Sequence, residues 1–220
     1  PSEADDAAYR AAISAAAGGA TVDYLDTRIT TPSVAPLLQY DAVYTWVNFD
    51  YLDPVGFGNN LAAYNDQGGN VVLGVFCTFT TGNFLSGTIM TAGYCPVDSP
   101  FGTNHFVSSN YKGDGTTCIY TGVVSLACQF RDFLVAQGSG VIDGTYLDNE
   151  ICHAYRGASG AGLEELVVGP AVRGDEYARR LRQGGLGGRE QGRQAFGETG
   201  GQVVGQYRGD CTLKLRRGFE

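Results

Sequence analysis

The sequence predicts an α/β fold: a three-layer sandwich with a mainly parallel, doubly wound sheet, plus loop and hairpin insertions stapled by disulfides. Two observations predict it. The first third of the chain alternates short apolar runs with segments of helical spacing, and six cysteines, an even number, occur in 220 residues. Strands separated by helices of about ten residues imply right-handed crossovers and a parallel sheet covered on both faces.

The first predicted element is a short Ala-rich helix that is capped at Ser2 and ends at the glycines 18–19. Residues 21–26 then form a candidate strand, and the cap and proline at Thr31 and Pro32 predict a second short helix. A doubly wound sheet normally begins with a strand before its first helix, and none precedes Ser2. The first strand is therefore apparently missing, and either it was cut away or another segment or chain takes its place.

The next elements give the clearest pattern. Residues 41–48 are a buried strand candidate, and Asp53 followed by Pro54 predicts the start of a helix. Apolar side chains at helical spacing continue that helix, namely Phe57, Leu61 and Tyr64. Residues 70–77 are the third strand candidate, and this strand runs directly into Cys77.

Residues 78–149 are rich in Gly, Thr, Ser and Tyr, which predicts loops and short β-hairpins. The spacing favours a disulfide that joins Cys118 to Cys128, followed by one that joins Cys77 to Cys95, with Cys152 and Cys211 as the remaining candidates. Six cysteines permit 15 pairings, so spacing alone leaves the connectivity open. The sequence has no Cys-x-x-Cys pair, and its histidines number two. We therefore expect no zinc or other metal site and no cofactor.

The composition divides the chain at about residue 157. Residues 1–156 form the predicted α/β domain, whereas residues 157–220 contain sixteen glycines and ten of the fifteen basic residues. Such a stretch buries little, so we expect it to be poorly ordered or held by a partner. A gene read in a shifted frame would also produce sequence of this kind.

Charge and hydropathy exclude several classes of partner. A net charge of −8 argues against nucleic acid and anionic membranes as the main partners, and no apolar run is long enough to span a bilayer. The cysteine density predicts an oxidising compartment, extracellular or at the cell surface. The sequence starts at Pro1 rather than at a methionine, so we expect a processed or partial product whose targeting signal, if any, lies upstream.

Three runs carry a family resemblance: residues 24–28, residues 38–46 and residues 61–76. Together they resemble the class I glutamine amidotransferase-like fold, a flavodoxin-like α/β sandwich, and are most similar to the non-enzymatic versions found in large secreted proteins. The resemblance covers about residues 4–78, with weaker continuity to residue 155. It implies a sheet with helices on both faces and, in the enzymes of the family, a nucleophilic cysteine after a central strand.

Cys77 is the candidate nucleophile. The catalytic hypothesis has its thiolate activated by His153 or His105 and oriented by Glu150 or Asp148. The structural hypothesis makes Cys77 a half-cystine or a buried thiol at the end of a strand.

Two departures from the amidotransferase pattern favour the structural hypothesis. Amidotransferases place glycines on both sides of the nucleophile, because a strained strand-to-helix turn needs residues without Cβ. Here Phe76 and Thr78 flank Cys77. The family's His-x-Glu is also replaced by Glu150 and His153 in the reverse order.

The acidic residues of the loops are a separate candidate for binding. Carboxylates in Gly-rich loops can hold calcium, although they are also common in solvated turns; the candidates are Asp98, Asp114, Asp143, Asp148 and Glu150.

The sequence therefore leads to one function hypothesis and two alternatives. The leading hypothesis is a non-catalytic structural or adhesive module of a larger secreted or cell-surface protein, whose partners are proteins or copies of itself. The first alternative is a cysteine-dependent amidase or glutaminase-like hydrolase that uses Cys77. The second is a calcium- or carbohydrate-binding module that uses the loops of residues 78–150.

Overall fold

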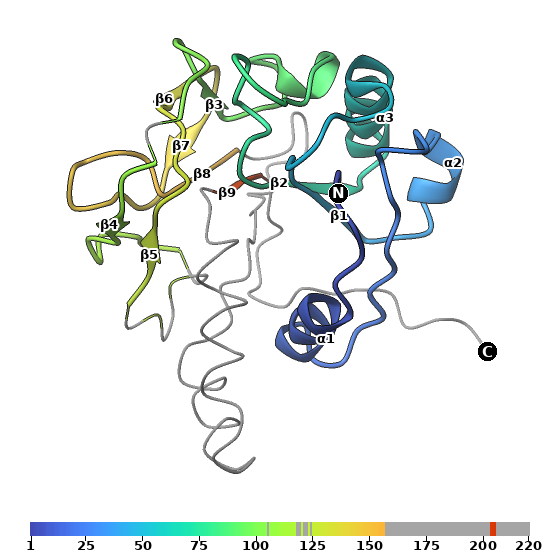
Figure 1. The fold of residues 1–220 in the computed structure, drawn as a ribbon, viewed down its shortest axis with the longest axis horizontal. Helices are drawn as coiled ribbons and strands as arrows, with labels where there is room; N and C mark the ends of the chain where they lie inside the picture. The colour runs from blue at the N-terminus through green and yellow to red at the C-terminus, as the bar shows by residue number, and fades with distance from the viewer. Residues whose placement is uncertain (105, 118–119, 121–122, 124, 157–202, 206–220) are drawn as a thin grey trace.

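A computed structural model of the chain describes residues 1–104, 106–117, 120, 123, 125–156 and 203–205 (Figure 1). Its helices are α1 (Ala7–Ala16), α2 (Val34–Leu37), α3 (Pro54–Asp66) and the 3₁₀-helix η1 (Thr88–Met90). Its strands are β1 (Ala42–Thr45), β2 (Asn70–Leu73), β3 (Val97–Asp98), β4 (Ser109–Asn110), β5 (Ala127–Cys128), β6 (Val135–Ala136), β7 (Val141–Ile142), β8 (His153–Tyr155) and β9 (Val203–Gly205).

The strands form one larger and two small sheets. The larger sheet has the order β1-β2-β9-β8-β7, and the small ones pair β3 with β6 and β4 with β5. In the larger sheet β1 with β2 and β8 with β9 are parallel, whereas β2 with β9 and β7 with β8 are antiparallel. The mixed α/β class is thus confirmed, but the larger sheet is mixed rather than mainly parallel.

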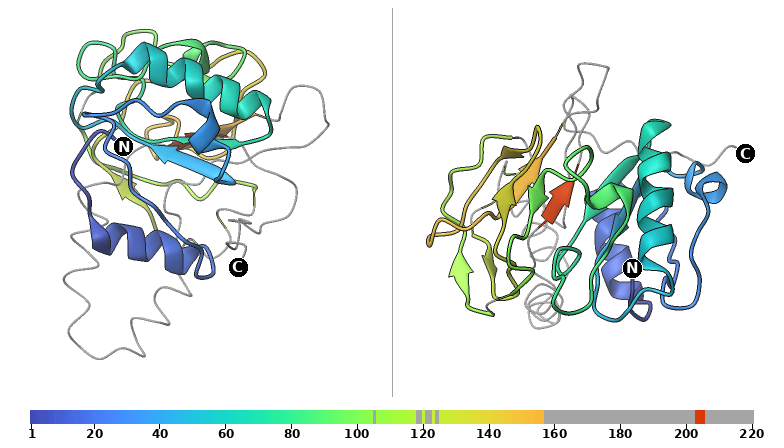
Figure 2. Two further views of the ribbon diagram at one scale, coloured as in Figure 1. Left: turned by 90° about the vertical axis from the view of Figure 1, so that its right-hand side faces the viewer. Right: turned by 90° about the horizontal axis from the view of Figure 1, so that it is seen from above.

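The helix α3 forms as its sequence predicts. The Asp53 carboxylate accepts a hydrogen bond from the Gly56 amide at 2.8 Å, and Pro54 occupies the first turn, where its missing N–H costs nothing. The predicted apolar face is buried, with Phe57, Leu61 and Tyr64 all at most 2% exposed. This helix covers one side of the β1–β2 pair, while α1 lies on the other side of β1 (Figure 2).

Two predicted strands differ from the structure. Residues 21–26 form no strand, because no neighbouring ladder satisfies their backbone among the residues that the structure describes. The third strand ends at Leu73 rather than at Cys77. Phe76 adopts a φ of 68°, in the left-handed region, which turns the chain away from the strand direction.

The helix α1 is capped by Asp6, whose side chain accepts hydrogen bonds from the amides of Ala8 and Tyr9, and not by Ser2 as the sequence suggested. Ser2 is instead fully buried and makes an isolated parallel bridge with Val47, just beyond β1. Among the described residues, this single bridge is the only strand-like pairing before the first helix.

The prediction of disulfide staples is wrong for the cysteines that the structure describes. Cys77, Cys95, Cys128 and Cys152 are all free and buried. The bridges expected between Cys77 and Cys95 and from Cys128 to Cys118 are therefore not formed, while Cys118 and Cys211 themselves lie outside the described residues.

The finding that the described cysteines are free also overturns the prediction of an extracellular or cell-surface location. It rested on bridged cysteines, and the described ones are thiols. Free thiols identify no other compartment in its place.

Two further sequence predictions concern length and composition. No helix among the described residues is both long and apolar enough to cross a membrane. Apart from β9, the predicted extension at residues 157–220 lies outside the described residues, so its expected disorder or partner contact stays a prediction.

Candidate functional site

A cysteine-dependent α/β hydrolase, the first alternative function, would carry its nucleophile just after β2. A short turn holds Cys77 there, with its amide donating to the Gly74 carbonyl at 3.3 Å and the strained Phe76 just before it. A non-glycine residue with positive φ at such a place is often a sign of a functional turn. The surroundings of the Cys77 side chain decide whether that holds here.

The Cys77 side chain belongs to the hydrophobic core. It is 1% exposed, and its thiol lies 3.7 Å from the Thr45 carbonyl, to which it donates, and 4.0 Å from the Tyr51 hydroxyl. Burial raises the pKa of the Cys77 thiol far above its usual value. Because the thiolate is the nucleophilic form, a thiol held in this way is inert at neutral pH.

The residues expected to activate Cys77 are engaged elsewhere. Nδ1 of His153 lies 3.2 Å from the Asp143 carbonyl oxygen and 3.4 Å from its carboxylate, in a buried position on β8. Glu150 accepts a hydrogen bond from Arg131 at 2.9 Å. The remaining histidine, His105, lies outside the described residues.

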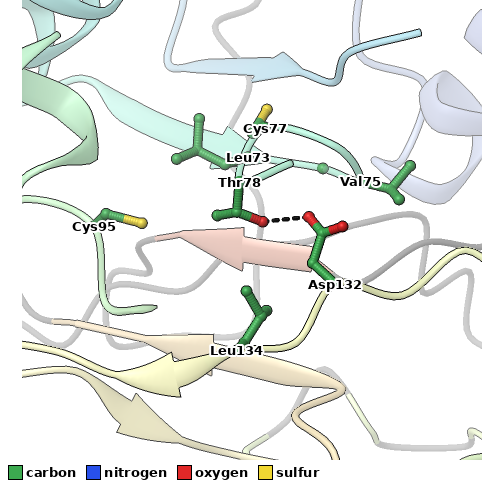
Figure 3. Close-up of a pocket in the computed structure, with 8 residues that line it drawn as sticks. Leu73, Val75, Cys77, Thr78, Cys95, Asp132 and Leu134 are labelled. Carbon is green, nitrogen blue, oxygen red and sulfur yellow. Dashed lines mark hydrogen bonds between the residues drawn. The ribbon is translucent and has the colours of Figure 1, made fainter. Parts of the chain in front are cut away.

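A small cavity lies beside the turn (Figure 3). Its volume is about 10 Å³, barely the room of one water molecule, and its lining includes Cys77, Thr78, Cys95 and Asp132. The Thr78 hydroxyl donates to the Asp132 carboxylate, whereas the sulfur of Cys77 points away from Asp132 (Figure 3). A space of this size holds no amide substrate.

Sequence reasoning missed the buried charges at residues 131 and 132. Arg131 is fully buried. Its Nη1 donates a hydrogen bond to the Asp148 carboxylate at 3.0 Å and another to Glu150, and its Nη2 forms an ion pair with the second Asp148 oxygen at 2.8 Å. It also donates to the Val107 carbonyl through Nε at 2.9 Å and Nη2 at 2.6 Å. Despite partial burial, the hydrogen bonds from Arg131 hold the pKa of Asp148 below its usual range.

Asp132, the neighbour of Arg131, is 2% exposed and accepts a hydrogen bond from the Asn104 side chain at 3.1 Å. The available signal was a charged pair between Phe130 and Phe133, because charges inside an apolar run are buried only when they are paired. Arg131 links its own loop to the loop of Val107 and to the loop of Asp148 and Glu150, so its role is structural.

Four of the five carboxylates considered for calcium already have protein donors, whereas the fifth, Asp98, lies exposed on β3. Asp143 accepts hydrogen bonds from the amides and hydroxyls of Thr116 and Thr117, and these donors and His153 lower its pKa in spite of burial. Asp114 accepts from the Thr145 amide at 2.8 Å and from its hydroxyl at 2.5 Å. No group of three or more His, Cys, Asp or Glu residues placed to hold a metal occurs among the described residues.

A cluster of aromatic rings surrounds the strained turn. Three rings pack together, with centroids at most 6.1 Å apart in each pair: Phe76, Phe106 and Phe130. The ring centroid of Phe79 lies 5.6 Å from that of Phe76. Phe106 also has a positive φ, 48°, and its side chain is 45% exposed. Both strained residues thus contribute to one packed aromatic cluster, which gives the strain a structural explanation.

Comparisons with known proteins identify no relative. No protein-family model matches the chain, and neither the curated proteins nor the solved structures contain a match.

Proposed function

We propose that residues 1–156 act as a non-catalytic structural or protein-interaction module of a larger protein or assembly. The observation that carries the proposal is the state of Cys77. A buried, protonated thiol that donates to a main-chain carbonyl fills space in a core, whereas a nucleophile needs an exposed thiolate and a base.

The fold of this module, in our proposal, is the three-layer sandwich of the class I glutamine amidotransferase-like group in its non-enzymatic form. The parallel β1–β2 pair with its α3 crossover supports it, and so does the position of α1 on the opposite side of β1 (Figure 2). The partners of such a module would be protein surfaces or further copies of the chain.

Neither alternative function gains support from a specific contact. A hydrolase would need His153 or Glu150 beside Cys77, but these side chains bind Asp143 and Arg131. A calcium site would need several free carboxylates, and all the candidates but Asp98 are bonded to hydroxyl, amide or guanidinium donors.

The experiment compares Cys77→Ala with Cys95→Ala, a second buried thiol that is also 1% exposed. A core thiol contributes packing, so each substitution should lower the free energy of unfolding by about 1–2 kcal/mol in urea denaturation. Catalytic groups are often held at a cost, and their removal commonly stabilises the protein. A gain in stability for Cys77→Ala, with a loss for Cys95→Ala, would argue against the structural role.

A further inference from the structure

The strand β9 fills a slot between two strands that do not pair with each other. In the larger sheet, β2 has β1 on one side, β8 has β7 on one side, and both pair with β9 on the other side (Figure 1). Two strand spacings amount to about 9.6 Å, and the two ladders of β9 set this width. The slot between β2 and β8 therefore holds one strand.

The two ladders fix the direction and the register of the strand in the slot. β9 is antiparallel to β2, with Val204 opposite Leu73, and parallel to β8, with the same Val204 opposite Ala154. Ladders of this kind join backbone groups, as they do when an extended peptide adds to a sheet. The slot therefore recognises an extended backbone that runs in one direction.

The walls of the slot are buried. Val72 and Leu73 on β2 and Ala154 on β8 are all at most 5% exposed. Backbone N–H and C=O groups in such a position need a hydrogen-bond partner in the protein, because water does not reach them. Among the described residues, β9 is the strand that pairs with both of these inner edges. An empty slot is therefore unfavourable.

The strand in the slot comes from far along the sequence. β8 ends at Tyr155 and β9 begins at Val203, so residues 156–202 lie between them. A chain of that length can span on the order of 150 Å when it is extended, so the connection does not determine which copy of the chain supplies β9. The entropic cost of closing a loop also rises with its length, which weakens the preference for the copy's own strand.

We propose that the slot between β2 and β8 is the site through which two copies of the chain associate, each inserting its β9 into the slot of the other. Identical strands make identical ladders in either copy, so the exchange keeps every hydrogen bond of the sheet. Because each copy gives one strand and receives one, the assembly closes as a dimer with twofold symmetry.

A second copy fits the slot better than an unrelated peptide does. Every copy carries the segment that the structure places there, residues 203–205, whereas an unrelated strand would have to displace it. The inference deepens the proposed function and rests on it, because it names a copy of the chain as the partner of the module. The proposed function is tested at Cys77 and this inference at β9, so the two can fail separately.

The first measurement is sedimentation velocity of the unaltered full chain, equilibrated at concentrations from micromolar to millimolar. The proposal predicts a dimer whose share rises with concentration and which an excess of a synthetic peptide of residues 199–209, containing β9, dissociates. The matched control is the same peptide with Val204→Pro. Proline has no N–H, and the loss of one ladder hydrogen bond should weaken the effect of the peptide about tenfold.

The second measurement uses the full-chain variant Val204→Pro, whose own β9 cannot complete both ladders. This variant should stay monomeric. It should also bind the fluorescently labelled peptide of residues 199–209 about tenfold more tightly than the unaltered chain does, because the competing strand no longer fills the slot. Fluorescence anisotropy measures both affinities. If the variant does not fold, the first measurement decides alone.

Two results would overturn the proposal. An unaltered chain that stays monomeric at every concentration would mean that each copy keeps its own β9. A dimer that the peptide does not dissociate, and that Val204→Pro still forms, would place the contact between copies at another surface.

Discussion

Replacing the buried guanidinium with an apolar side chain of similar length, Arg131→Met, should destabilise the protein strongly. The change removes the hydrogen bonds to Asp148, Glu150 and the Val107 carbonyl while leaving the carboxylates in place. Removal of one partner from a buried ion pair typically costs about 3–5 kcal/mol. The Asp148 and Glu150 side chains are 39% and 19% exposed, so water recovers part of that cost, and we expect about 3 kcal/mol.

The assay is urea unfolding followed by the fluorescence of Trp46 and by far-UV circular dichroism. With a slope of about 2 kcal/mol per molar urea, the unfolding midpoint should fall by about 1.5 M. The control is Arg10→Met, because Arg10 pairs with Asp5 where both side chains are more than a third exposed. Such surface pairs contribute at most about 1 kcal/mol.

A second variant keeps the test decisive if Arg131→Met does not fold. Arg131→Lys retains the charge but loses the planar fork that binds Asp148 through two nitrogens, so its loss should be intermediate. If both Arg131 variants cost no more than Arg10→Met, the buried network does not hold the three loops together, and our account of it is wrong.

Two further predictions concern packing and pH. A Cβ on Gly58 would lie 1.7 Å from the Ser86 carbonyl oxygen, so Gly58→Ala should lower the melting temperature far more than Gly93→Ala, whose Cβ would have its nearest neighbour at 3.7 Å; equal effects would contradict the packing of α3 on that loop. For a chain prepared with Pro1 as its first residue, the free energy of unfolding should rise between pH 6 and 8 by up to about 2.7 kcal/mol, because the Pro1 amino group has a pKa of about 6 when folded and near 8 when unfolded, so that the unfolded chain binds more protons. A peptide bond at Pro1 should abolish this rise in calorimetry, while a rise that persists would place its origin elsewhere.

The sequence predicted those elements whose signals are local. Asp53 and Pro54 act within one turn, and the buried face of α3 follows from side chains three and four residues apart. Residues 21–26 have a strand-like pattern, but a strand also needs a neighbour, and the sequence pattern contains no information about one. The β1–β2 pair was predictable because a single crossover helix joins the two strands.

The site depended on contacts that sequence spacing does not report. Cys77 and Cys95 were paired on their spacing, whereas the structure buries each as a separate thiol. Arg131 binds residues from two other loops, and the sequence carried no signal of these contacts beyond the charged pair at residues 131–132, which the sequence analysis missed. Side-chain convergence of this kind follows from tertiary packing rather than from local pattern.

The central claim, that Cys77 is a sealed core thiol, is tested most directly by alkylating the native, unreduced protein and mapping the labelled peptides by mass spectrometry. The account predicts that Cys77 stays unlabelled near neutral pH over a time that fully labels an unfolded sample, and that it then appears as a free thiol once urea is added. Rapid labelling of Cys77 in the native protein, ahead of Cys95, Cys128 and Cys152, would contradict the account and would indicate a reactive thiolate at the end of β2.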